Sequence, residues 1–229
     1  MSDDPDRPLR GRDEHEMGDE HDHGQHDGHG HDHGDHDDHG HDHHHHDVES
    51  LGAAVATVSS TRTLDDDPSG DAIAAAFEAE GHEVATREML RDDYDGVQSA
   101  LGNLARRDDV DVVVTTGGTG VTPDDVTVEA ASGLFEKELP GFGELFRRLS
   151  YEEIGTRVVG TRAVAGIVAG TPVFCLPGSE NAARLGSEEV IVPEAPHLAG
   201  LAGREDGEDG EHDHGHHHGE EDHDHDHEA

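Results

Sequence analysis

The chain has 229 residues, and its 15 Lys or Arg against 55 Asp or Glu give a formal net charge of −40 at pH 7. This charge excludes general binding to nucleic acid, because a phosphate backbone attracts clustered cations and is repelled by an acidic surface. No apolar run reaches the roughly 18 residues of a membrane span. The first residues lack the hydrophobic stretch of a signal peptide, and the lone Cys175 cannot form an intramolecular disulfide. We therefore expect a cytoplasmic protein.

Three segments differ sharply in composition. Residues 1–47 contain 14 His and 16 acidic residues, and residues 204–229 contain 8 His and 12 acidic residues. Both tails have too few apolar side chains to bury a core, so we expect them to be disordered. Residues 48–203 have the composition and length of one globular domain. This domain carries 11 Lys or Arg against 27 Asp or Glu, a net charge of −16, which indicates a halophilic protein whose surface charge is screened by salt.

The first half of the domain alternates predicted strands and helices. Residues 53–58 (AAVATV) form a short apolar run typical of a strand. After a turn-forming stretch, Ser69 or Asp71 can cap a helix that ends near Gly81. Residues 83–90 (EVATREML) are predicted as a second strand. A second helix follows, with one apolar face at helical spacing made of Val97, Ala100, Leu101, Leu104 and Ala105.

Two further apolar runs predict buried strands. They span residues 110–116 (VDVVVTT) and 171–176 (TPVFCL), and each leads directly into a glycine-containing loop. Alternating strands and helices favour a mostly parallel sheet. Because parallel crossovers are right-handed and helices then cover both faces, we expect a three-layer, doubly wound α/β domain.

Ligands of such sheets bind outside the carboxyl ends of the strands. The loops expected there are residues 59–62, 91–93, 116–120 and 177–179. Glycines in the third loop let backbone N–H groups approach an anion, and a helix expected from about Thr127 would point its N-terminus toward the same crevice. This pattern predicts a phosphate-bearing ligand. A tight turn that needs glycine for geometry alone remains an alternative, and neither a P-loop nor a dinucleotide fingerprint is present.

Four separated segments, in order along the chain, carry a family resemblance. The segments TGGTGVTPDDVTVEA (116–130), LPGFGELFRRLSYEEIGT (139–156), TRAVAG (161–166) and FCLPGSENAARL (174–185) resemble the MoaB/MogA family of molybdenum cofactor biosynthesis proteins. The similarity runs from about Leu51 to Leu198 and implies the molybdopterin-binding fold. It also implies a molybdopterin adenylyltransferase, which uses Mg²⁺ and ATP to transfer AMP to the pterin phosphate and releases pyrophosphate.

The resemblance also implies site residues. The family's functional acids fall on Asp125 and Asp92, which would be the catalytic carboxylates on the Mg²⁺ side, with Asp124 as a rival to Asp125. Four of the few cations of the domain, Arg62, Arg147, Arg157 and Arg162, are candidate phosphate partners, although surface ion pairs would explain them as well. Of these we select Arg62 and Arg162 as ligand-binding residues. Counting these two, the predicted ligand-binding residues are Ser59, Arg62, Gly117, Gly118, Thr119, Gly120, Glu144, Arg162, Gly178 and Ser179. A helix cap is the alternative role for Ser179.

Three departures from the family pattern bear on the site. Val128 stands where many members have proline, Thr161 stands where serine is common, and Asp124 replaces a frequent basic residue. The family also contains members that bind pterin without adenylylating it. A non-catalytic molybdopterin-binding scaffold or carrier is therefore an alternative function.

The histidine-rich tails suggest a separate role. Neutral imidazole binds divalent transition metals such as Ni²⁺, Zn²⁺ and Co²⁺. The tail residues that we single out are His43, His44, His45, His46, His216, His217 and His218. Their spacing predicts many weak sites rather than one structural zinc, so divalent-metal storage or buffering is a third possible function. The family resemblance further implies a homotrimer or hexamer, with residues 140–170 as a candidate contact, and a molybdenum-insertion protein as a partner.

Overall fold

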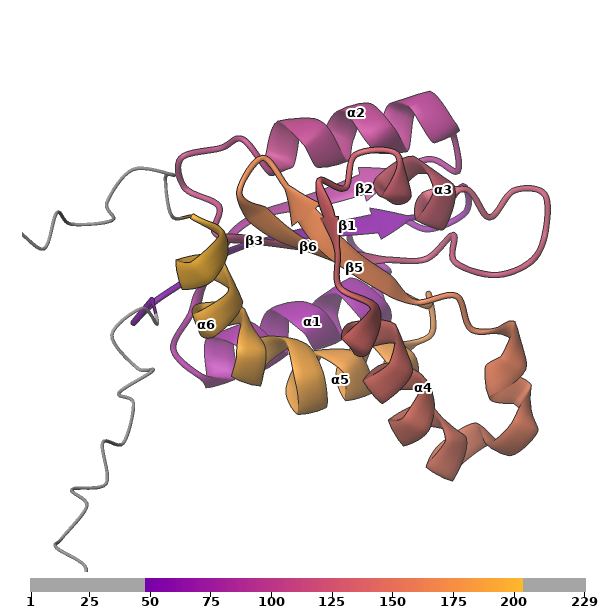
Figure 1. The fold of residues 1–229 in the computed structure, drawn as a ribbon. Coiled ribbons are helices and arrows are strands. Elements are labelled where there is room, and N and C mark those ends of the chain that lie inside the picture. The colour runs from indigo at the N-terminus through magenta and orange to yellow at the C-terminus, as the bar shows by residue number, and fades with distance from the viewer. Residues whose placement is uncertain (1–47, 204–229) are drawn as a thin grey trace, which may run out of the picture. The chain divides into compact units, whose positions relative to one another are not determined.

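The computed structural model describes residues 48–203, so the predictions for both tails, including their histidine clusters, lie outside the described residues. Figure 1 shows the helices and strands, coloured from the N-terminus to the C-terminus. They are β1 (Gly52–Val58), α1 (Pro68–Ala79), β2 (Glu83–Leu90), α2 (Tyr94–Leu104), β3 (Val112–Thr116), α3 (Thr127–Ser132), β4 (Lys137–Glu138), α4 (Pro140–Ile154), η2 (Gly155–Gly160), β5 (Val164–Val168), β6 (Thr171–Leu176), α5 (Glu180–Gly186), η3 (Ser187–Ile191) and α6 (Val192–Ala202).

The six strands form one sheet in the order β2-β1-β3-β6-β5-β4. The pairs β1–β2, β1–β3 and β3–β6 are parallel, which confirms the mostly parallel sheet. Strand β5 is antiparallel to both β4 and β6, and this edge was not predicted. Its cause is the two-residue connection from β5 to β6 through Ala169 and Gly170, both at positive φ (49° and 79°). So short a turn can only reverse the chain, because a parallel crossover needs a dozen or so residues.

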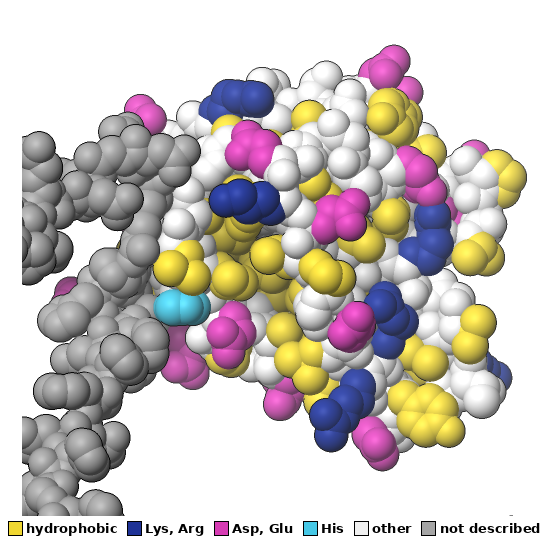
Figure 2. All heavy atoms as spheres, viewed as in Figure 1, with side chains coloured by type: hydrophobic (Ala, Val, Ile, Leu, Met, Phe, Trp, Pro, Cys, Tyr) yellow, Lys and Arg dark blue, Asp and Glu magenta, His cyan; other side chains and the backbone are white. Residues whose placement is uncertain are grey.

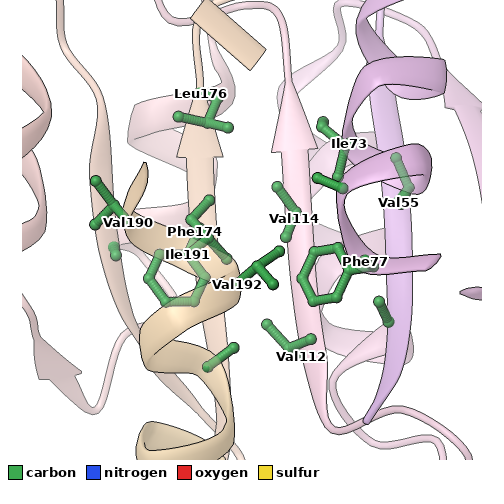
Figure 3. Packing of buried hydrophobic residues seen from close by; sticks show 14 of the residues in the cluster. Val55, Ile73, Phe77, Val112, Val114, Phe174, Leu176, Val190, Ile191 and Val192 are labelled. Atoms are coloured by element: carbon green, nitrogen blue, oxygen red, sulfur yellow. The ribbon is translucent and has the colours of Figure 1, made fainter. Parts of the chain in front are cut away.

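Two hydrophobic layers, one on each face of the sheet, confirm the three-layer architecture. Figure 1 shows α2 and α3 on one face and α1, α4, α5 and α6 on the other. On the second face Phe77 of α1 and Ile191 of η3 pack with Val114 and Phe174 of the sheet, as Figure 3 shows. On the first face Leu101 of α2 is fully buried. Apolar side chains therefore point to both faces of β3 and β6, as expected of central parallel strands.

Helix α1 begins earlier than the sequence predicted. Its N-cap is Asp67, whose side chain accepts a hydrogen bond from the N–H of Gly70, and Pro68 occupies the first turn. The prediction of Ser69 or Asp71 as the cap is therefore wrong. Proline directly after an acidic residue favours that residue as the cap, because proline needs no hydrogen-bond partner at the first helical position.

Residues 140–170, the candidate subunit contact, contain α4, η2 and β5. Phe142 and Phe146 anchor α4 on the core, whereas Tyr151, Ile154 and Val159 are exposed.

On the face shown in Figure 2, Lys and Arg side chains are scattered among acidic and hydrophobic ones. None of the helices in residues 48–203 combines the length and hydrophobicity needed to cross a membrane.

Candidate functional site

Four loops meet at the carboxyl edge of the parallel strands. They follow β1, β2, β3 and β6, whose carboxyl ends lie on the same side of the sheet because these strands are parallel. The loops after β3 and β6 are tied together. The hydroxyl of Thr116 donates to the carbonyl of Pro177 (2.9 Å), and the N–H of Gly117 donates to the carbonyl of Leu176 (3.0 Å). The edge predicted to bind a ligand is therefore built from segments distant in the sequence.

The loop after β3 needs glycine at two positions. Gly117 and Gly118 have φ values of 99° and 64°, in the left-handed region that favours glycine. A Cβ on Gly117 would lie 2.2 Å from the carbonyl oxygen of Val58, and one on Gly118 would lie 2.2 Å from Oγ1 of Thr127. The glycines therefore serve close approach as well as turn geometry, and they hold the loop against the end of β1 and the start of α3.

A cavity of about 320 Å³ opens at this loop. Its lining comprises Gly117, Gly118, Thr119, Gly120, Asp125, Gly160, Thr161, Pro177 and Gly178. Within residues 48–203 the N–H groups of Gly118 and Thr119 donate no hydrogen bond, so both are available to a ligand. Backbone N–H groups on a glycine loop suit an anion.

A second cavity of about 350 Å³ lies beside the first, between α4 and α5. The two cavities share Thr161 and Pro177. Phe146, Ile154 and Leu185 give the second cavity an apolar wall that the glycine-lined cavity lacks. The site therefore offers a glycine-lined part and an adjoining apolar part.

Asp125 is the acid of the first cavity. Its carboxylate accepts hydrogen bonds from the hydroxyl (2.6 Å) and the N–H (2.8 Å) of Thr122. The hydroxyl bond is the main cause that lowers the pKa of Asp125 from its ordinary 3.8; the N–H groups of Thr122 and Gly120 and the cation of Arg162 act in the same direction, against partial burial, which raises it. Asp125 is thus ionised at neutral pH. The rival Asp124 is exposed and does not line this cavity.

Asp92 and Ser59 lie at the same edge but outside the cavity lining. Asp92 accepts a hydrogen bond from Ser60 (2.6 Å), which joins the loops after β1 and β2. The hydroxyl of Ser59 accepts from the N–H groups of Thr61 and Arg62, so it shapes the loop that carries Arg62. The structure therefore brings Asp125, rather than Asp92, to the glycine loop.

The two predicted phosphate-binding arginines differ in their surroundings. Arg62 uses Nη1 for both of its side-chain hydrogen bonds, to Ser69 (2.8 Å) and to the carbonyl of Gly178 (3.1 Å). Within residues 48–203 its Nε and Nη2 make no hydrogen bond; Arg62 does not line the glycine-lined cavity but contacts Gly178, which does. Arg162 instead binds the segment that carries Asp125, through the carbonyls of Gly120 and Asp125.

The remaining predicted residues are dispersed. Gly178 lines the glycine cavity, and Ser179 lines the second cavity. Ser179 also caps α5 by accepting from the N–H of Ala182 (3.3 Å), so it has the alternative role considered from the sequence. Glu144 lines a different cavity, of about 190 Å³, near the antiparallel edge, and the structure does not bring it to the glycine loop.

Three lining residues, Gly160, Thr161 and Pro177, received no ligand-binding role in the sequence analysis. Gly160 and Thr161 reach the first cavity from the end of η2, which lies more than thirty residues beyond the glycine loop in the sequence. Pro177 had a signal, because it lies in a predicted loop, but no role was assigned to it. Thr127 does not line the cavity; it is fully buried beside Gly118, and its hydroxyl has no hydrogen-bond partner in the described part of the chain.

Comparison with known proteins matches residues 54–197 to a family profile described as "Probable molybdopterin binding domain". Molybdenum cofactor biosynthesis protein B of Bacillus cereus is 43% identical over 145 residues, 63% of this chain and 86% of the relative. Its namesake in Bacillus subtilis is also 43% identical over 145 residues, 63% of this chain and 85% of that protein.

Solved structures agree with these sequence matches. A crystal structure of a Molybdenum cofactor biosynthesis protein B has a TM-score of 0.66 at 40% identity and covers 69% of this chain and 99% of its own. The tungsten cofactor synthesizing protein MoaB from Pyrococcus furiosus has a TM-score of 0.61 at 40% identity, with the same coverage. The profile spans more than half of the chain and lies within the described residues 48–203. The chain therefore belongs to the molybdopterin-binding-domain family that includes the molybdenum cofactor biosynthesis proteins MoaB and MogA.

Proposed function

We propose that this chain acts in molybdenum cofactor biosynthesis as a molybdopterin adenylyltransferase. A terminal phosphate oxygen of molybdopterin would attack the α-phosphorus of ATP, the bond from that phosphorus to the pyrophosphate oxygen would break, and AMP would remain on the pterin phosphate. The observation that carries the proposal is the glycine-lined cavity with an ionised Asp125 in its wall. Membership of the family supports the pathway, and the cavity supports the chemistry.

The chain's own residues suit the reactants. The free N–H groups of Gly118 and Thr119 would hold phosphate oxygens at the glycine loop. Arg62, fixed through Nη1, would offer its remaining guanidinium donors to the same phosphates. The apolar wall of the adjoining cavity would take a ring system and exclude water. Holding two anions in line contributes much of the rate in such transfers.

The described residues fit a Mg²⁺ ion that arrives with the nucleotide. Among them no group of three or more His, Cys, Asp or Glu could form an all-protein cage. Mg²⁺ commonly takes one or two carboxylates and completes its shell with phosphates and waters. Asp125 is ionised and retains lone pairs beyond those used by Thr122 and Gly120, so it would hold the ion. When bound, Mg²⁺ would offset the charge of the phosphates.

Pyrophosphate release by the full-length chain tests this function. We expect release only when molybdopterin, ATP and Mg²⁺ are all present. Replacing Asp125 by Asn should lower kcat by roughly 10²- to 10³-fold, the size typical of losing one preorganised electrostatic group. The matched control is Asp124→Asn, which removes an exposed neighbouring charge and should stay within about threefold of wild type.

The outcomes separate the enzyme from the scaffold. Wild-type protein that binds molybdopterin but releases no pyrophosphate at any salt concentration would make the chain a pterin-binding scaffold. Equal rates for Asp125→Asn and wild type would instead show that turnover does not use this carboxylate. A loss of turnover in Asp124→Asn alone would move the role to the neighbouring acid.

A further inference from the structure

The segment Gly120–Asp125, which we call the aspartate loop, has few attachments to the rest of the domain. Val121 is 77% exposed, and the next three residues are also exposed. The hydrogen bonds inside the loop join Asp125 to Thr122 and Gly120. Within residues 48–203 the only hydrogen bonds that tie this loop to another segment come from Arg162. Among the described residues, Arg162 is therefore the one side chain that hydrogen-bonds this loop to a different segment.

Arg162 grips the aspartate loop with its whole guanidinium. Its Nε donates to the carbonyl of Gly120 (2.6 Å), and its Nη2 donates to the carbonyl of Asp125 (3.2 Å). Its Nη1 pairs with Oε1 of Glu129, while Nη2 also reaches Oε2 of that residue (3.4 Å). Arg162 lies between η2 and β5, and Glu129 lies on α3. The two ends of the loop and α3 are thus fastened to one point outside them.

We propose that Arg162 is a positioning residue that fixes the aspartate loop, with Glu129 holding its guanidinium in place, rather than a phosphate ligand. This role rests on the proposed function only in so far as Asp125 serves catalysis. The printed contacts use four of the five guanidinium N–H groups, on the loop and on Glu129, so the one left on Nη1 cannot make the two-point contact that arginine typically makes with a phosphate. Arg62, whose two side-chain bonds both leave from Nη1, has free donors and is the better phosphate partner.

The charge on Glu129 helps to hold the Arg162 guanidinium in place. Its pairing with Arg162 lowers the pKa of Glu129 below its ordinary 4.5, so the pair persists at neutral pH. Both side chains are partly exposed, and an exposed pair contributes little to global stability. Its effect should therefore appear as local order in the loop, not as stability of the whole domain.

Amide hydrogen exchange of the full-length chain tests the proposal without any need for turnover. In Arg162→Gln we expect exchange in the aspartate loop to rise by roughly tenfold or more, because both external hydrogen bonds are lost. Exchange in β1 and β3 should stay at wild-type rates. The control is Arg157→Gln, which removes a cation that makes no hydrogen bond within the described residues; loop exchange there should not change.

A second pair of measurements separates positioning from phosphate binding. If Arg162 positions the loop, Arg162→Gln should lower kcat at least tenfold, because Asp125 is then held less precisely. The Kd for Mg-ATP should change by less than about threefold, because the glycine loop and Arg62 still contact the phosphates. Arg162→Lys should not restore kcat, since a point charge cannot make the forked contacts of a guanidinium. A phosphate ligand would give a raised Kd that lysine partly restores.

The possible results remain decisive if a variant folds poorly or the enzyme proves inactive. Unchanged loop exchange in Arg162→Gln overturns the proposal whatever the turnover. If exchange in β1 and β3 also rises in Arg162→Gln, the test passes to Glu129→Gln, which keeps the arginine and removes its counter-charge. That variant must then raise amide exchange in the aspartate loop alone. If it does not, the proposal is also overturned. An inactive wild type with a loosened loop in Arg162→Gln would refute adenylylation and leave the positioning role standing.

Discussion

Replacing Asp67 by Ala should destabilise the domain far more than replacing any exposed acid. The Asp67 residue is only 2% exposed, and its carboxylate accepts four hydrogen bonds. The donors are the Thr57 hydroxyl (2.6 Å), the Ser69 hydroxyl (3.1 Å), the Gly70 N–H (3.0 Å) and Arg87 Nη2 (3.2 Å). The carboxylate therefore joins β1, β2 and the start of α1.

The magnitude follows from these contacts. Losing the helix cap costs about 1 kcal/mol. Orphaning the Thr57 hydroxyl, on a residue 1% exposed, adds about 1–3 kcal/mol. The side chain of Arg87 is 28% exposed and also pairs with Asp71, so its loss is discounted. We expect a loss of about 2–4 kcal/mol, which moves a urea midpoint by roughly 1–2 M at a slope of about 2 kcal/mol per molar.

Urea unfolding followed by circular dichroism at constant salt measures the difference. The matched control is Asp71→Ala, because Asp71 pairs with the same arginine and its side chain is 63% exposed; its loss should stay within about 1 kcal/mol. Asp67→Asn keeps the cap and should fall between the two. Equal midpoints for Asp67→Ala and Asp71→Ala would refute this account of the buried carboxylate.

The pH dependence has a definite sign. Burial alone would raise the pKa of Asp67, but the hydrogen bonds from Thr57, Gly70, Ser69 and Arg87 outweigh it and lower the pKa from 3.8. A lowered folded-state pKa contributes stability above the unfolded value, and that contribution disappears as the pH falls through the folded value. The stability gap between wild type and Asp67→Asn should therefore be constant near neutral pH and narrow below about pH 4.

Two further predictions concern the glycine loop and the tails. Gly118→Ala should lower the free energy of unfolding by about 2–4 kcal/mol and weaken Mg-ATP binding, because φ is +64° and the new Cβ would lie 2.2 Å from Thr127 Oγ1. Calorimetry measures the change. In the control Gly141→Ala the new Cβ meets nothing within 4 Å, so its stability should stay within about 1 kcal/mol of wild type. Deleting residues 1–47 and 204–229 should preserve pyrophosphate release but abolish most Ni²⁺ binding. In the full chain, Ni²⁺ binding should be lost below about pH 5.5, because the imidazoles become protonated. Ni²⁺ retention by the shortened chain in equilibrium dialysis would contradict the proposed tail sites. Loss of pyrophosphate release by the shortened chain would instead favour a function that depends on the tails.

The central strands were predictable because buried parallel strands are continuous apolar runs that end at glycine loops. The predicted 171–176 strand coincides with β6, and 53–58 lies within β1. Strand β5 was missed because its pairing depends on the turn at Ala169 and Gly170, where alanine gives no sign of its positive φ. Strand β4 has two exposed residues and no periodic signal.

The candidate site was partly predictable for the same reason. Glycines 117, 118 and 120 and Asp125 line one cavity, as loops at strand ends should. The sequence could not distinguish Arg62 from Arg162, since both were cations near the expected crevice. Their roles diverge through partners 116 and 42 residues away, and such separations leave no local pattern. For the same reason, Glu144 could not be assigned to its separate cavity from the sequence.

Thr161 and Pro177 line both cavities, so the two cavities share a wall. A molecule that shifts this wall from one side changes the fit offered on the other. The factor by which the first occupant alters the affinity of the second must equal the factor in the reverse direction. Titrating one proposed substrate in the presence of a saturating amount of the other would therefore measure whether the two bind with positive or negative cooperativity. Measurements with a single ligand do not give this coupling free energy.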